Sequence, residues 1–443
     1  MPSLNTGIHP AVSPRLMLPE PGPGAREDRA AYEVRGGYSG GPGGYLEGEE
    51  LISAVAESGL RGRGGAAFPL GVKLAAVASQ PGDHVLVVNG EEGEPASIKD
   101  RWLLRSRPHL VLDGALRAAS AIGAVTAYVY VSDDPAAESI RTALAELDEL
   151  PVPVHVRAVP HSYVAGEETA AVRAINGGPA KPSDKPPRPF EEGVAGRPTL
   201  VSNVETIANL PRIAAAAGPG QDVSPGRGFA PPGHGQETFL MTLTGSCPRP
   251  GLYEVPFGGT LGEAAETLGG LTGAPRGYLM GGYFAGLLNS RGHGLVLDYD
   301  VFRDEGSGLG CGAVIVLGPS DCPVGSAAQV MAYFDRNNAA QCGSCFNGTA
   351  AMSGVTSALA RGVAGPADVQ RLESWAAFLP GRGACATLDG AANVARSLLR
   401  EFPAEVEAHV RDRCGPCAEL DFSAQTPPFA VAAYAETVEE TAS

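Results

Sequence analysis

The sequence predicts an α/β domain built on a parallel sheet, followed by a small β-rich module and a helical C-terminal region. Between residues 49 and 158, short apolar runs alternate with segments of helical periodicity, which is the pattern of successive βαβ units. The stretch 218–236 is almost entirely Gly, Pro and polar residues, so it marks a boundary. From residue 326 onward the pattern is almost wholly helical.

The predicted α/β domain alternates its elements regularly. A helix ends at about Ser58 and leads into the Gly-rich loop 59–71, and the buried strand 84–88 ends in NGEEGEP. Because ligand sites of parallel sheets lie at the C-terminal ends of strands, this strand end is a candidate site. The expected elements are helices over 49–58, 110–124 and 135–149, and strands over 84–88, 126–131 and 153–158.

The remaining parts are assigned from shorter patterns. In the β-rich module, 238–245 and 295–302 have strand patterns and 261–269 has a helical one. The N-terminal arm is rich in Pro and Gly and is expected to be flexible, and the acidic tail after Cys417 is expected to pack poorly. The expected division is an arm at 1–30, the α/β domain at 31–217, a linker at 218–236, the β-rich module at 237–325, the helical region at 326–413 and a C-terminal segment with a C-x2-C pair at 414–443.

Composition excludes several classes of function. The 443 residues include 49 acidic and 33 basic ones, a net charge of −16, whereas a nucleic-acid-binding protein needs a basic face. No apolar run reaches the length of a transmembrane helix and no secretory signal is visible, so we expect a cytoplasmic location, at most peripheral to a membrane complex. Five of the 8 cysteines lie in the last quarter of the chain, in CGSC, GAC and CGPC contexts, which indicates metal or redox chemistry rather than a disulfide framework.

The Gly-rich loop GLRGRGGAAFPLG is the first candidate for ligand binding. Gly62, Gly64 and Gly65 would let the backbone approach a phosphate or a ring, and Arg63 and Lys73 supply positive charge nearby. An ordinary structural turn is the alternative. The loop follows a helix rather than a strand, so it does not satisfy the dinucleotide-binding fingerprint.

Polar and acidic residues gather at the predicted strand ends. Asn89, Glu91, Glu92 and Glu94 follow the first strand, and three carboxylates so close together repel one another unless a ligand or partner compensates them. A solvated acidic turn is the alternative. The segment YVAGEETAAV repeats the theme at the start of a helix, where its carboxylates could equally serve the helix dipole. A fourth block, GRPTLVSNVETIANLP, joins a strand-like TLV to polar side chains.

In this order and spacing, the four blocks resemble the family of the flavin-bearing F subunit of NADH:quinone oxidoreductase (respiratory complex I) and its relatives in hydrogenases and formate dehydrogenases. The blocks are GLRGRGGAAFPLGVK, NGEEGEPASIKDR, YVAGEETA and GRPTLVSNVET. LTGSCPRPGLYEVPFGGTLGE, QCGSCFNGT and GRGACATLDGAA extend the resemblance, which runs from about Tyr32 to Val410. The resemblance implies a Rossmann-like α/β domain for flavin and NADH, an SLBB-like β-grasp module, and a C-terminal helical bundle of the iron–sulfur-binding type.

The resemblance also implies that the chain binds FMN and takes hydride from NAD(P)H. The cofactor would carry the redox chemistry while the protein orients it. Glu94 matches the carboxylate beside the nicotinamide, and Glu94 and Glu92 are the expected catalytic residues. The residues at FMN-contact positions are Gly62, Gly64, Gly65, Lys73, Asn89, Glu91, Glu92, Tyr163, Gly166, Glu167, Glu168, Val201, Ser202, Asn203 and Thr206. The expected NAD(P)-binding residues are Arg63, Phe68, Glu94, Lys185 and Arg188.

The nucleotide site departs from the family pattern at two positions. Ala76 stands where the family has an aromatic residue, and Arg188 replaces a second aromatic in KPPRP, while Lys185 is retained. Each lost stacking face would weaken adenine binding by about 1–3 kcal/mol. Arg188 beside Lys185 could instead grip a 2′-phosphate, and an ordinary surface salt bridge is the alternative.

The iron–sulfur motif is incomplete. The family holds a [4Fe-4S] cluster with C-x2-C-x2-C and a later fourth cysteine, whereas only Cys342, Cys345 and Cys385 match here. The best register aligns the first family cysteine with Ala339, and a shifted register would place Gly348 at the third position. A three-thiolate cluster with an outside ligand or an open iron site, a cluster completed from elsewhere in the chain, and a lost cluster are all open interpretations.

The C-terminal pair of cysteines offers the nearest spare thiolates. Cys414 or Cys417 could supply the fourth ligand of the cluster. The pair could also be a redox dithiol or half of a zinc site, and zinc is disfavoured because we expect neither a second pair nor a nearby histidine. Cys247, Cys311 and Cys322 are expected to be core residues.

These observations together predict an FMN-dependent NAD(P)H dehydrogenase subunit that passes single electrons to an iron–sulfur partner or a quinone-linked chain. The expected receiver is a ferredoxin-like or thioredoxin-like iron–sulfur protein, with other oxidoreductase subunits as further partners. A non-catalytic scaffold that keeps the fold but has lost the cluster is the alternative. The retained Asn89, Glu94 and Lys73 favour activity, whereas the missing thiolate favours the scaffold.

Overall fold

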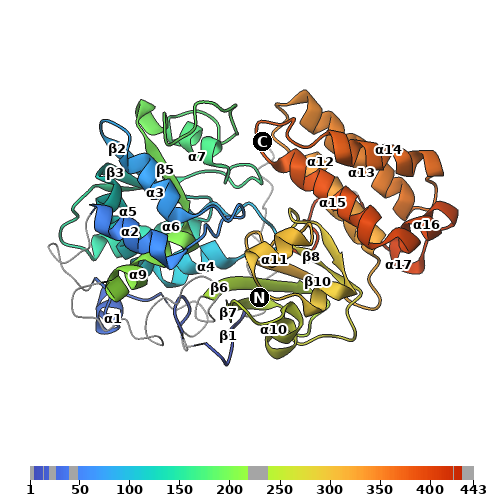
Figure 1. Ribbon diagram of the computed structural model, residues 1–443, viewed down its shortest axis with the longest axis horizontal. Helices are drawn as coiled ribbons and strands as arrows, with labels where there is room; N and C mark the ends of the chain where they lie inside the picture. The colour runs from blue at the N-terminus through green and yellow to red at the C-terminus, as the bar shows by residue number, and fades with distance from the viewer. Residues whose placement is uncertain are drawn as a thin grey trace.

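The computed structural model describes residues 4–12, 14–18, 26–38, 48–217, 238–422 and 424–431. The described residues form two sheets and a helical region (Figure 1). In Figure 1 the first sheet and its helices lie at the left, the helical region lies at the right, and the second sheet lies below and between them. The predicted linker, 218–236, falls outside the described residues.

The first sheet is parallel throughout, as predicted. Its strands stand in the order β4-β3-β2-β5, and β2 is parallel to both β3 and β5. β2 is an almost uninterrupted apolar run that is buried nearly along its whole length, which is typical of a central strand covered on both faces. The strands are β2 (His84–Asn89), β3 (Ala124–Val131), β4 (Val154–Ala158) and β5 (Thr199–Asn203).

Helices connect and cover these strands. The longest, α5, begins with a proline at its first turn and ends at Gly123, whose left-handed φ of 63° is a common way to terminate a helix. The helices are α1 (Arg29–Val34), α2 (Gly48–Ser58), α3 (Leu70–Ala78), α4 (Lys99–Ser106), α5 (Pro108–Ile122), α6 (Asp134–Ala145), α7 (Glu168–Ile175), α8 (Val204–Ala208) and α9 (Leu210–Ala217). The three predicted helices correspond to α2, α5 and α6, whereas α3 and α4 are absent from the prediction.

The second sheet is mixed and has six strands in the order β1-β7-β6-β10-β8-β9. β6 forms an antiparallel hairpin with β7 and pairs in parallel with β10. Helix α10 (Leu261–Leu268) starts with a capping box made by Thr260 and Glu263. The strands are β1 (Asn5–Ile8), β6 (Thr238–Gly245), β7 (Gly251–Pro256), β8 (Gly277–Met280), β9 (Leu287–Asn289) and β10 (Ala313–Leu317).

Two expectations about this part of the chain are wrong. The segment 295–302 does not form a strand, because the Asp298 side chain accepts hydrogen bonds from the N–H groups of Asp300 and Val301 and starts helix α11 (Tyr299–Asp304). The described part of the N-terminal arm is not loose either. Its strand β1 is paired with β7, and the N–H groups of Leu16 and Met17 bind the buried carboxylate of Glu254.

The helical region packs against the second sheet. The Ser397 hydroxyl on α15 donates to the Asn393 carbonyl at 2.7 Å and accepts the N–H of Leu287 at 2.8 Å, which ties α15 to β9. Buried side chains from both parts share one apolar core. The helices are α12 (Pro323–Asn337), α13 (Gly343–Ala360), α14 (Pro366–Phe378), α15 (Thr387–Glu401), α16 (Pro403–Arg411) and α17 (Gly415–Ala418).

The chain beyond Cys417 packs more closely than its composition predicted. Leu420, Phe422 and Phe429 contact the core of the helical region, and Val431 is buried in the core of the first sheet. Arg336 of α12 donates hydrogen bonds to the carbonyls of Phe422 and Ala424 at 3.0 and 2.9 Å. Residues 432–443 of the predicted tail fall outside the described part. Among the described residues, no helix has the length and apolarity needed to cross a membrane.

Candidate functional site

The site forms where two neighbouring parallel strands end. β3 and β4 continue from β2 on one side, whereas β5 joins its other side, so the strand order changes direction beside β2. Open α/β sheets bind ligands at such a point, outside the C-terminal ends of the strands. Asn89 at the end of β2 lies opposite Asn203 at the end of β5, and all four sequence blocks meet around these two residues.

The Gly-rich loop lies directly on the end of β5. The Arg63 N–H donates to the Thr206 hydroxyl at 2.8 Å, and a Cβ on Gly64 would come within 3.2 Å of the Asn203 Cβ. Gly65 has a φ of +123°, a conformation that side chains rarely allow. Gly62 closes the loop by donating its N–H to the Phe68 carbonyl at 2.9 Å. Gly64 is therefore favoured by its close approach to Asn203 and Gly65 by its backbone conformation, whereas Gly62 makes only ordinary van der Waals contact.

The arginines of this loop do not face the site, which corrects the expectation for Arg63. Arg63 is 3% exposed, lies 4.8 Å from the centre of the Phe257 ring, and donates to the Tyr299 hydroxyl at 2.7 Å. The neighbouring Arg61 makes a two-pronged ion pair with Asp300 at 2.8 and 3.0 Å. Both guanidinium groups fasten the loop to the second sheet, so neither is available for a nucleotide phosphate in this structure.

The loops after β2 and before α7 interlock. The Asn89 side chain donates to the Gly166 carbonyl at 2.7 Å. A Cβ on Gly93 would come within 2.6 Å of the Tyr163 carbonyl, and a Cβ on Gly166 within 2.7 Å of the Glu91 carboxylate. These contacts bring the second and third sequence blocks together as one wall of the site, with Val201 and Ser202 buried on the adjacent β5.

The carboxylate of Glu91 in this wall has one oxygen with partners in the described part of the chain and one without. Its Oε1 atom lies 3.3 Å from the His161 ring and receives the Ser132 hydroxyl at 3.3 Å. Its Oε2 atom is buried and has no hydrogen-bond partner among the described residues. A buried carboxylate oxygen without a donor is costly, so this atom fits a ligand that supplies one.

Glu92 has a different position from the one expected of a catalytic residue. One carboxylate oxygen accepts the Ser97 hydroxyl at 2.6 Å and the Asp100 N–H at 3.2 Å. The other accepts two donors of Arg101, the N–H at 3.1 Å and Nε at 3.3 Å. Both oxygens are thus committed to the first turn of α4, where a negative charge is favourable. Glu92 is therefore held in place by α4, and its expected catalytic role stays a prediction.

Glu94 lies where the two sheets meet. Its carboxylate accepts the Tyr283 N–H at 3.0 Å and the Ala96 N–H at 3.3 Å, and a Cβ on Gly282 would overlap it. Burial raises the pKa of Glu94 to about 8, against the lowering effect of the two N–H groups, and the negative charge of Glu92 adds to the rise. A strongly raised pKa is a common property of functional carboxylates, so Glu94 remains a candidate for chemistry.

A buried cation beneath the site was missed from the sequence. Lys99 is 0% exposed and makes ion pairs with Asp100 at 2.7 Å and Glu205 at 3.1 Å, and it donates to the Asn203 side chain at 3.2 Å. Burial alone would lower the pKa of Lys99, but Asp100 and Glu205 raise it well above its ordinary range. The pattern SIKDR gives no sign of this network, because the partner Glu205 is far away in sequence.

The side chains of Lys73 and Lys185 are paired with carboxylates of the YVAGEETA block. Lys73 lies 3.3 Å from Glu168, and Lys185 lies 2.7 Å from Glu167 and 3.5 Å from Glu168. Glu167 caps α7 by accepting the N–H groups at the start of the helix, as the alternative interpretation of this block expected. Although burial opposes it, Lys73 and Lys185 lower the pKa of Glu168. These lysines therefore offer positive charge that the carboxylates partly neutralise.

Two predicted nucleotide-binding residues lie at the surface. The Phe68 side chain is 53% exposed, which is unusual for a large apolar ring and leaves much of the ring open for stacking. Arg188 is exposed, and within the described part of the chain no hydrogen bond or ion pair engages its side chain. The surface salt bridge considered for Arg188 is therefore not formed here.

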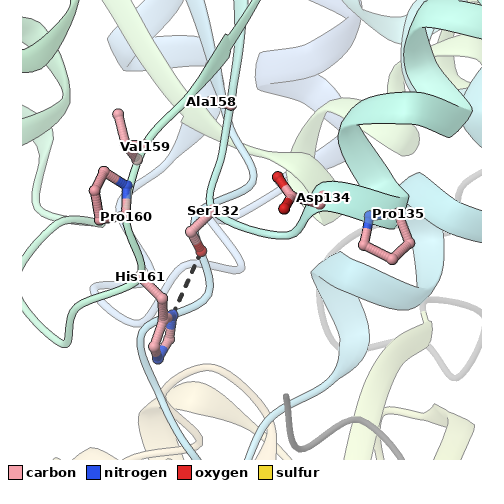
Figure 2. Close-up of a pocket in the computed structure, with 7 residues that line it drawn as sticks. All are labelled: Ser132, Asp134, Pro135, Ala158, Val159, Pro160 and His161. Carbon is pink, nitrogen blue, oxygen red and sulfur yellow. Dashed lines mark hydrogen bonds between the residues drawn. The ribbon is translucent and has the colours of Figure 1, made fainter. Parts of the chain in front are cut away.

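An open pocket of about 580 Å³ adjoins Glu91 at the ends of β3 and β4. Figure 2 shows the Ser132 hydroxyl pointing to the neighbouring His161 ring, 3.4 Å from its Nδ1 atom. Both side chains also contact Glu91. Ser132 and His161, neither of which was predicted, therefore lie between this pocket and Glu91. The remaining lining residues are Asp134, Pro135, Ala158, Val159 and Pro160.

The three matched cysteines converge in the helical region. Cys342, Cys345 and Cys385 line one small cavity of about 10 Å³, and Ala339 lines the same cavity. The Cys342 sulfur accepts the N–H of Ala384 at 3.4 Å, and burial raises the pKa of Cys345 to about 12. Gly348, on α13, instead packs against the side chains of Leu379 and Leu388. Only the register that aligns Ala339 with the missing cysteine therefore places four positions around one cavity.

Cys414 and Cys417 do not complete this group. A Cβ on Gly362, just past the C-terminal end of α13, would come within 2.6 Å of the Arg413 backbone, whereas Cys342 precedes the N-terminal end of α13. The 18 residues of α13 separate the two ends by about 27 Å at about 1.5 Å per residue. The expectation that the C-terminal pair supplies the fourth cluster ligand is therefore wrong. Cys322 is buried, as expected, and it lies beside this pair.

The geometry defines a class of protein: a parallel α/β domain with a Gly-rich loop and polar side chains at its strand ends, joined to a helical region with convergent thiols. Comparisons with known proteins agree. Residues 55–212 match the family described as the Nuo51 FMN-binding domain, and residues 325–409 match the NADH-ubiquinone oxidoreductase-F iron–sulfur binding region. The chain therefore carries both regions, and it belongs to the family of the F subunit of NADH-quinone oxidoreductase.

Individual relatives cover most of the chain. The second F subunit of NADH-quinone oxidoreductase in Rhizobium meliloti is 33% identical over 87% of this chain and 95% of its own length. The F subunit in Escherichia coli is 30% identical over 86% of this chain and 89% of its own. The solved structure of an NAD+-reducing [NiFe]-hydrogenase in the H2-reduced state has a TM-score of 0.71 at 26% identity and covers 82% of this chain. This chain spans 62% of that hydrogenase chain, less than two thirds of it.

Proposed function

We propose that this chain is an FMN-bearing subunit that oxidises NADH and delivers single electrons to other subunits. The observation that carries the proposal is the glycine cradle at the ends of β2 and β5, closed by the Glu91 oxygen that has no donor within the described chain. FMN, when bound, accepts hydride and releases electrons one at a time, so it links a nicotinamide donor to iron–sulfur carriers. The family membership supports the same activity.

The residues of the cradle have distinct tasks in this proposal. The backbone of Gly62, Gly64 and Gly65 admits the cofactor closely, and Lys73 supplies charge for its phosphate. Glu91 accepts a hydrogen bond from the cofactor through its unpartnered oxygen. The predicted contacts through Asn89, Tyr163, Gly166, Glu167, Glu168, Val201, Ser202, Asn203 and Thr206 remain part of the proposal, and several of these residues also hold the walls together.

Glu94 and Phe68 would form the nucleotide side of the site. Glu94 holds its proton at neutral pH because burial raises its pKa to about 8, so it adds no full negative charge beside a reduced nicotinamide. Phe68 offers an exposed ring for stacking against a base. Arg188, whose guanidinium group has no partner among the described residues, supports the proposal that a 2′-phosphate is accepted as well.

The three matched cysteines of the helical region support a cluster with one iron that is not held by cysteine. Three thiolates and Ala339 surround one cavity, in the register of the family motif. We propose that Cys342, Cys345 and Cys385 hold a [4Fe-4S] cluster whose fourth iron takes an outside ligand. The cluster, when bound, relays single electrons from the flavin toward a partner subunit. An iron–sulfur partner of ferredoxin-like or thioredoxin-like type remains our expectation for the receiver.

The division into domains is also a proposal. The second sheet pairs its strands in the order β7-β6-β10-β8-β9, with β6 and β10 parallel and with helix α10 packed on it. This order supports an SLBB-like β-grasp module at 237–325, to which β1 adds an edge strand. The helices from α12 to α16 support a helical bundle at 326–413, and 31–217 would be the FMN and NAD(P)H domain.

Titration with FMN, followed by addition of NADH under anaerobic conditions, tests the proposal. We expect about one FMN per chain, bleaching of the flavin absorbance by NADH, and reduction of an artificial one-electron acceptor. Glu91→Gln should weaken FMN binding, because the amide replaces an acceptor with a donor at the unpartnered position. Glu373→Gln, which changes an exposed carboxylate on α14, is the matched control. Protein that neither binds FMN nor shows bleaching would be the scaffold of the alternative hypothesis.

A further inference from the structure

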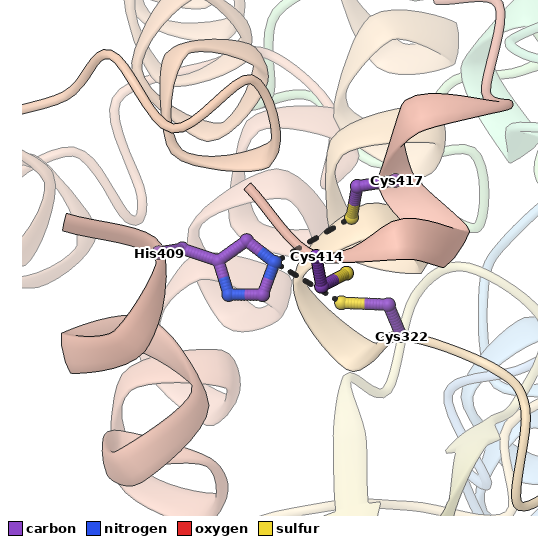
Figure 3. Close-up of side chains that lie close together, drawn as sticks. All are labelled: Cys322, His409, Cys414 and Cys417. Atoms are coloured by element: carbon purple, nitrogen blue, oxygen red, sulfur yellow. Dashed lines mark hydrogen bonds between the residues drawn. The ribbon is translucent and has the colours of Figure 1, made fainter. Parts of the chain in front are cut away.

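Four metal-ligating side chains outside the proposed flavin and iron–sulfur sites meet at one point (Figure 3). Cys322 precedes α12, His409 lies on α16, Cys414 precedes α17 and Cys417 lies within it. Their ligand atoms all lie within 4.8 Å of one another. Figure 3 shows the three sulfur atoms turned toward the same edge of the His409 ring. Segments far apart in sequence thus contribute to one cluster.

The histidine is oriented as a ligand. His409 Nδ1 lies 2.7 Å from the Glu405 carbonyl, an acceptor that requires Nδ1 to carry the ring proton in the neutral form. The Nε2 lone pair then faces the sulfur atoms of Cys322 at 3.4 Å and Cys417 at 3.6 Å. A hydrogen bond from the second ring nitrogen to a carbonyl is the usual support of a metal-bound histidine.

The distances fit a single tetrahedral ion. With metal–sulfur bonds of about 2.3 Å and metal–nitrogen bonds of about 2.0–2.1 Å, a tetrahedral zinc site has nitrogen–sulfur edges of about 3.5 Å and sulfur–sulfur edges of about 3.8 Å. The two observed nitrogen–sulfur distances of 3.4 and 3.6 Å bracket the expected edge. A [4Fe-4S] cluster separates its ligands by more than one metal ion does, so the compact spacing favours a mononuclear site.

The surroundings are those of a structural site rather than an open one. Cys322 is 6% exposed, Cys417 is 2% exposed and His409 is 4% exposed. A Cβ on Gly325 would come within 2.9 Å of the Cys417 sulfur, so the backbone of α12 is pressed against the cluster. A redox-active C-x2-C pair needs neither a third thiol nor an imidazole, whereas four converging donors match the closed Cys3His set of structural zinc.

We propose that Cys322, His409, Cys414 and Cys417 bind one zinc ion that fastens the C-terminal segment to the start of α12. Three of the four ligands lie outside the matched iron–sulfur region, 325–409, and the fourth is its last residue. The ion would therefore join the two ends of that region to each other. Soft thiolates with one imidazole in tetrahedral arrangement select zinc over the harder divalent ions.

Metal analysis of the full-length protein, purified anaerobically, tests the proposal. We expect about one zinc per chain in the wild type, loss of that zinc in Cys417→Ser and His409→Ala, and its retention in His409→Cys, which restores a four-ligand set. The triple variant Cys342→Ser, Cys345→Ser, Cys385→Ser should lose iron and keep zinc. Cys247→Ser removes a buried thiol of the second sheet and is the matched control.

The wild type alone keeps the proposal falsifiable if a ligand variant does not fold. Replacement of the metal by Co2+ should give the absorption of a tetrahedral thiolate-bound ion, and this spectrum should change in His409→Cys. Wild-type protein without zinc, or with iron in place of zinc at this position after the triple substitution, would overturn the proposal. Zinc that persists in Cys414→Ser, Cys417→Ser double-variant protein would overturn it as well.

Discussion

Glu94→Gln should make the protein more stable at high pH. The native pKa of Glu94 is about 8 and its ordinary value is 4.5, so between these values the native chain binds a proton that the unfolded chain has lost. Stability therefore falls as pH rises through this window, by about 5 kcal/mol at about 1.36 kcal/mol per pKa unit, or about 3 kcal/mol where water reaches the side chain. Glutamine carries no charge and does not share this loss.

The size of the effect is measured by denaturant unfolding of both proteins at pH 5, 7 and 9. At pH 5 the glutamine variant should be less stable than the wild type by about 1 kcal/mol. Its amide offers only one acceptor oxygen to the N–H groups of Tyr283 and Ala96. By pH 9 the variant should be the more stable by about 2–4 kcal/mol, because the wild type has lost about 3–5 kcal/mol and the amide costs about 1 kcal/mol. Glu373→Gln is the control. Parallel pH profiles for wild type and Glu94→Gln would refute the argument that burial holds the proton on Glu94.

Three further predictions concern the site. Ala339→Cys should supply a fourth thiolate and raise the iron content and oxygen tolerance of the cluster, measured by iron analysis and electron paramagnetic resonance; unchanged iron would contradict the Ala339 register. Gly64→Ala should weaken FMN binding about tenfold by crowding Asn203, whereas Gly354→Ala on α13, where a Cβ meets open space, should not. Arg188→Ala should raise the KM for NADPH about tenfold and leave that for NADH unchanged if Arg188 reads the 2′-phosphate; equal changes in both would show that it does not.

The first sheet could be predicted because its signals are local. The runs at 84–88 and 126–131 are continuous apolar segments, and such runs between helical patterns have few alternatives to buried parallel strands. The same pattern places Asn89 at a strand end, and the structure brings it opposite Asn203. Positions fixed by backbone approach, such as Gly64 against the end of β5, were also visible as glycines, although the surface they meet was not.

The wrong assignment at 295–302 has consequences for the site. The pattern LVLDYDVF predicts a strand, but the Asp298 side chain captures the next N–H groups and turns the chain into α11. That helix presents Tyr299 and Asp300 to the two arginines of the Gly-rich loop. From sequence, Arg63 is expected to bind a phosphate, because its partner Tyr299 lies in the segment that was predicted to be a strand. Long-range partners of charged side chains are not encoded in any local pattern.

The metal-ligating histidine illustrates a signal that was present but not recognised. His409 precedes Cys414 by five residues, a spacing that one helical end and a short turn can close onto one ion, as α16 and α17 do here. Cys322, by contrast, stands alone in DCPVG and resembles an ordinary core cysteine. Only the packing of α12 against α16 and α17 brings it to the others.

The C-terminal segment links this cluster to the nucleotide side of the site. After α17 the chain is held by Arg336 through two of its carbonyls, and the carbonyl of Pro428 then accepts the hydroxyl of Tyr283. The N–H of the same Tyr283 binds the Glu94 carboxylate at 3.0 Å. A segment whose composition predicts a loose tail therefore supports the residue that fixes Glu94. Through this segment, the anchoring at Cys414 and Cys417 would support the position of Glu94.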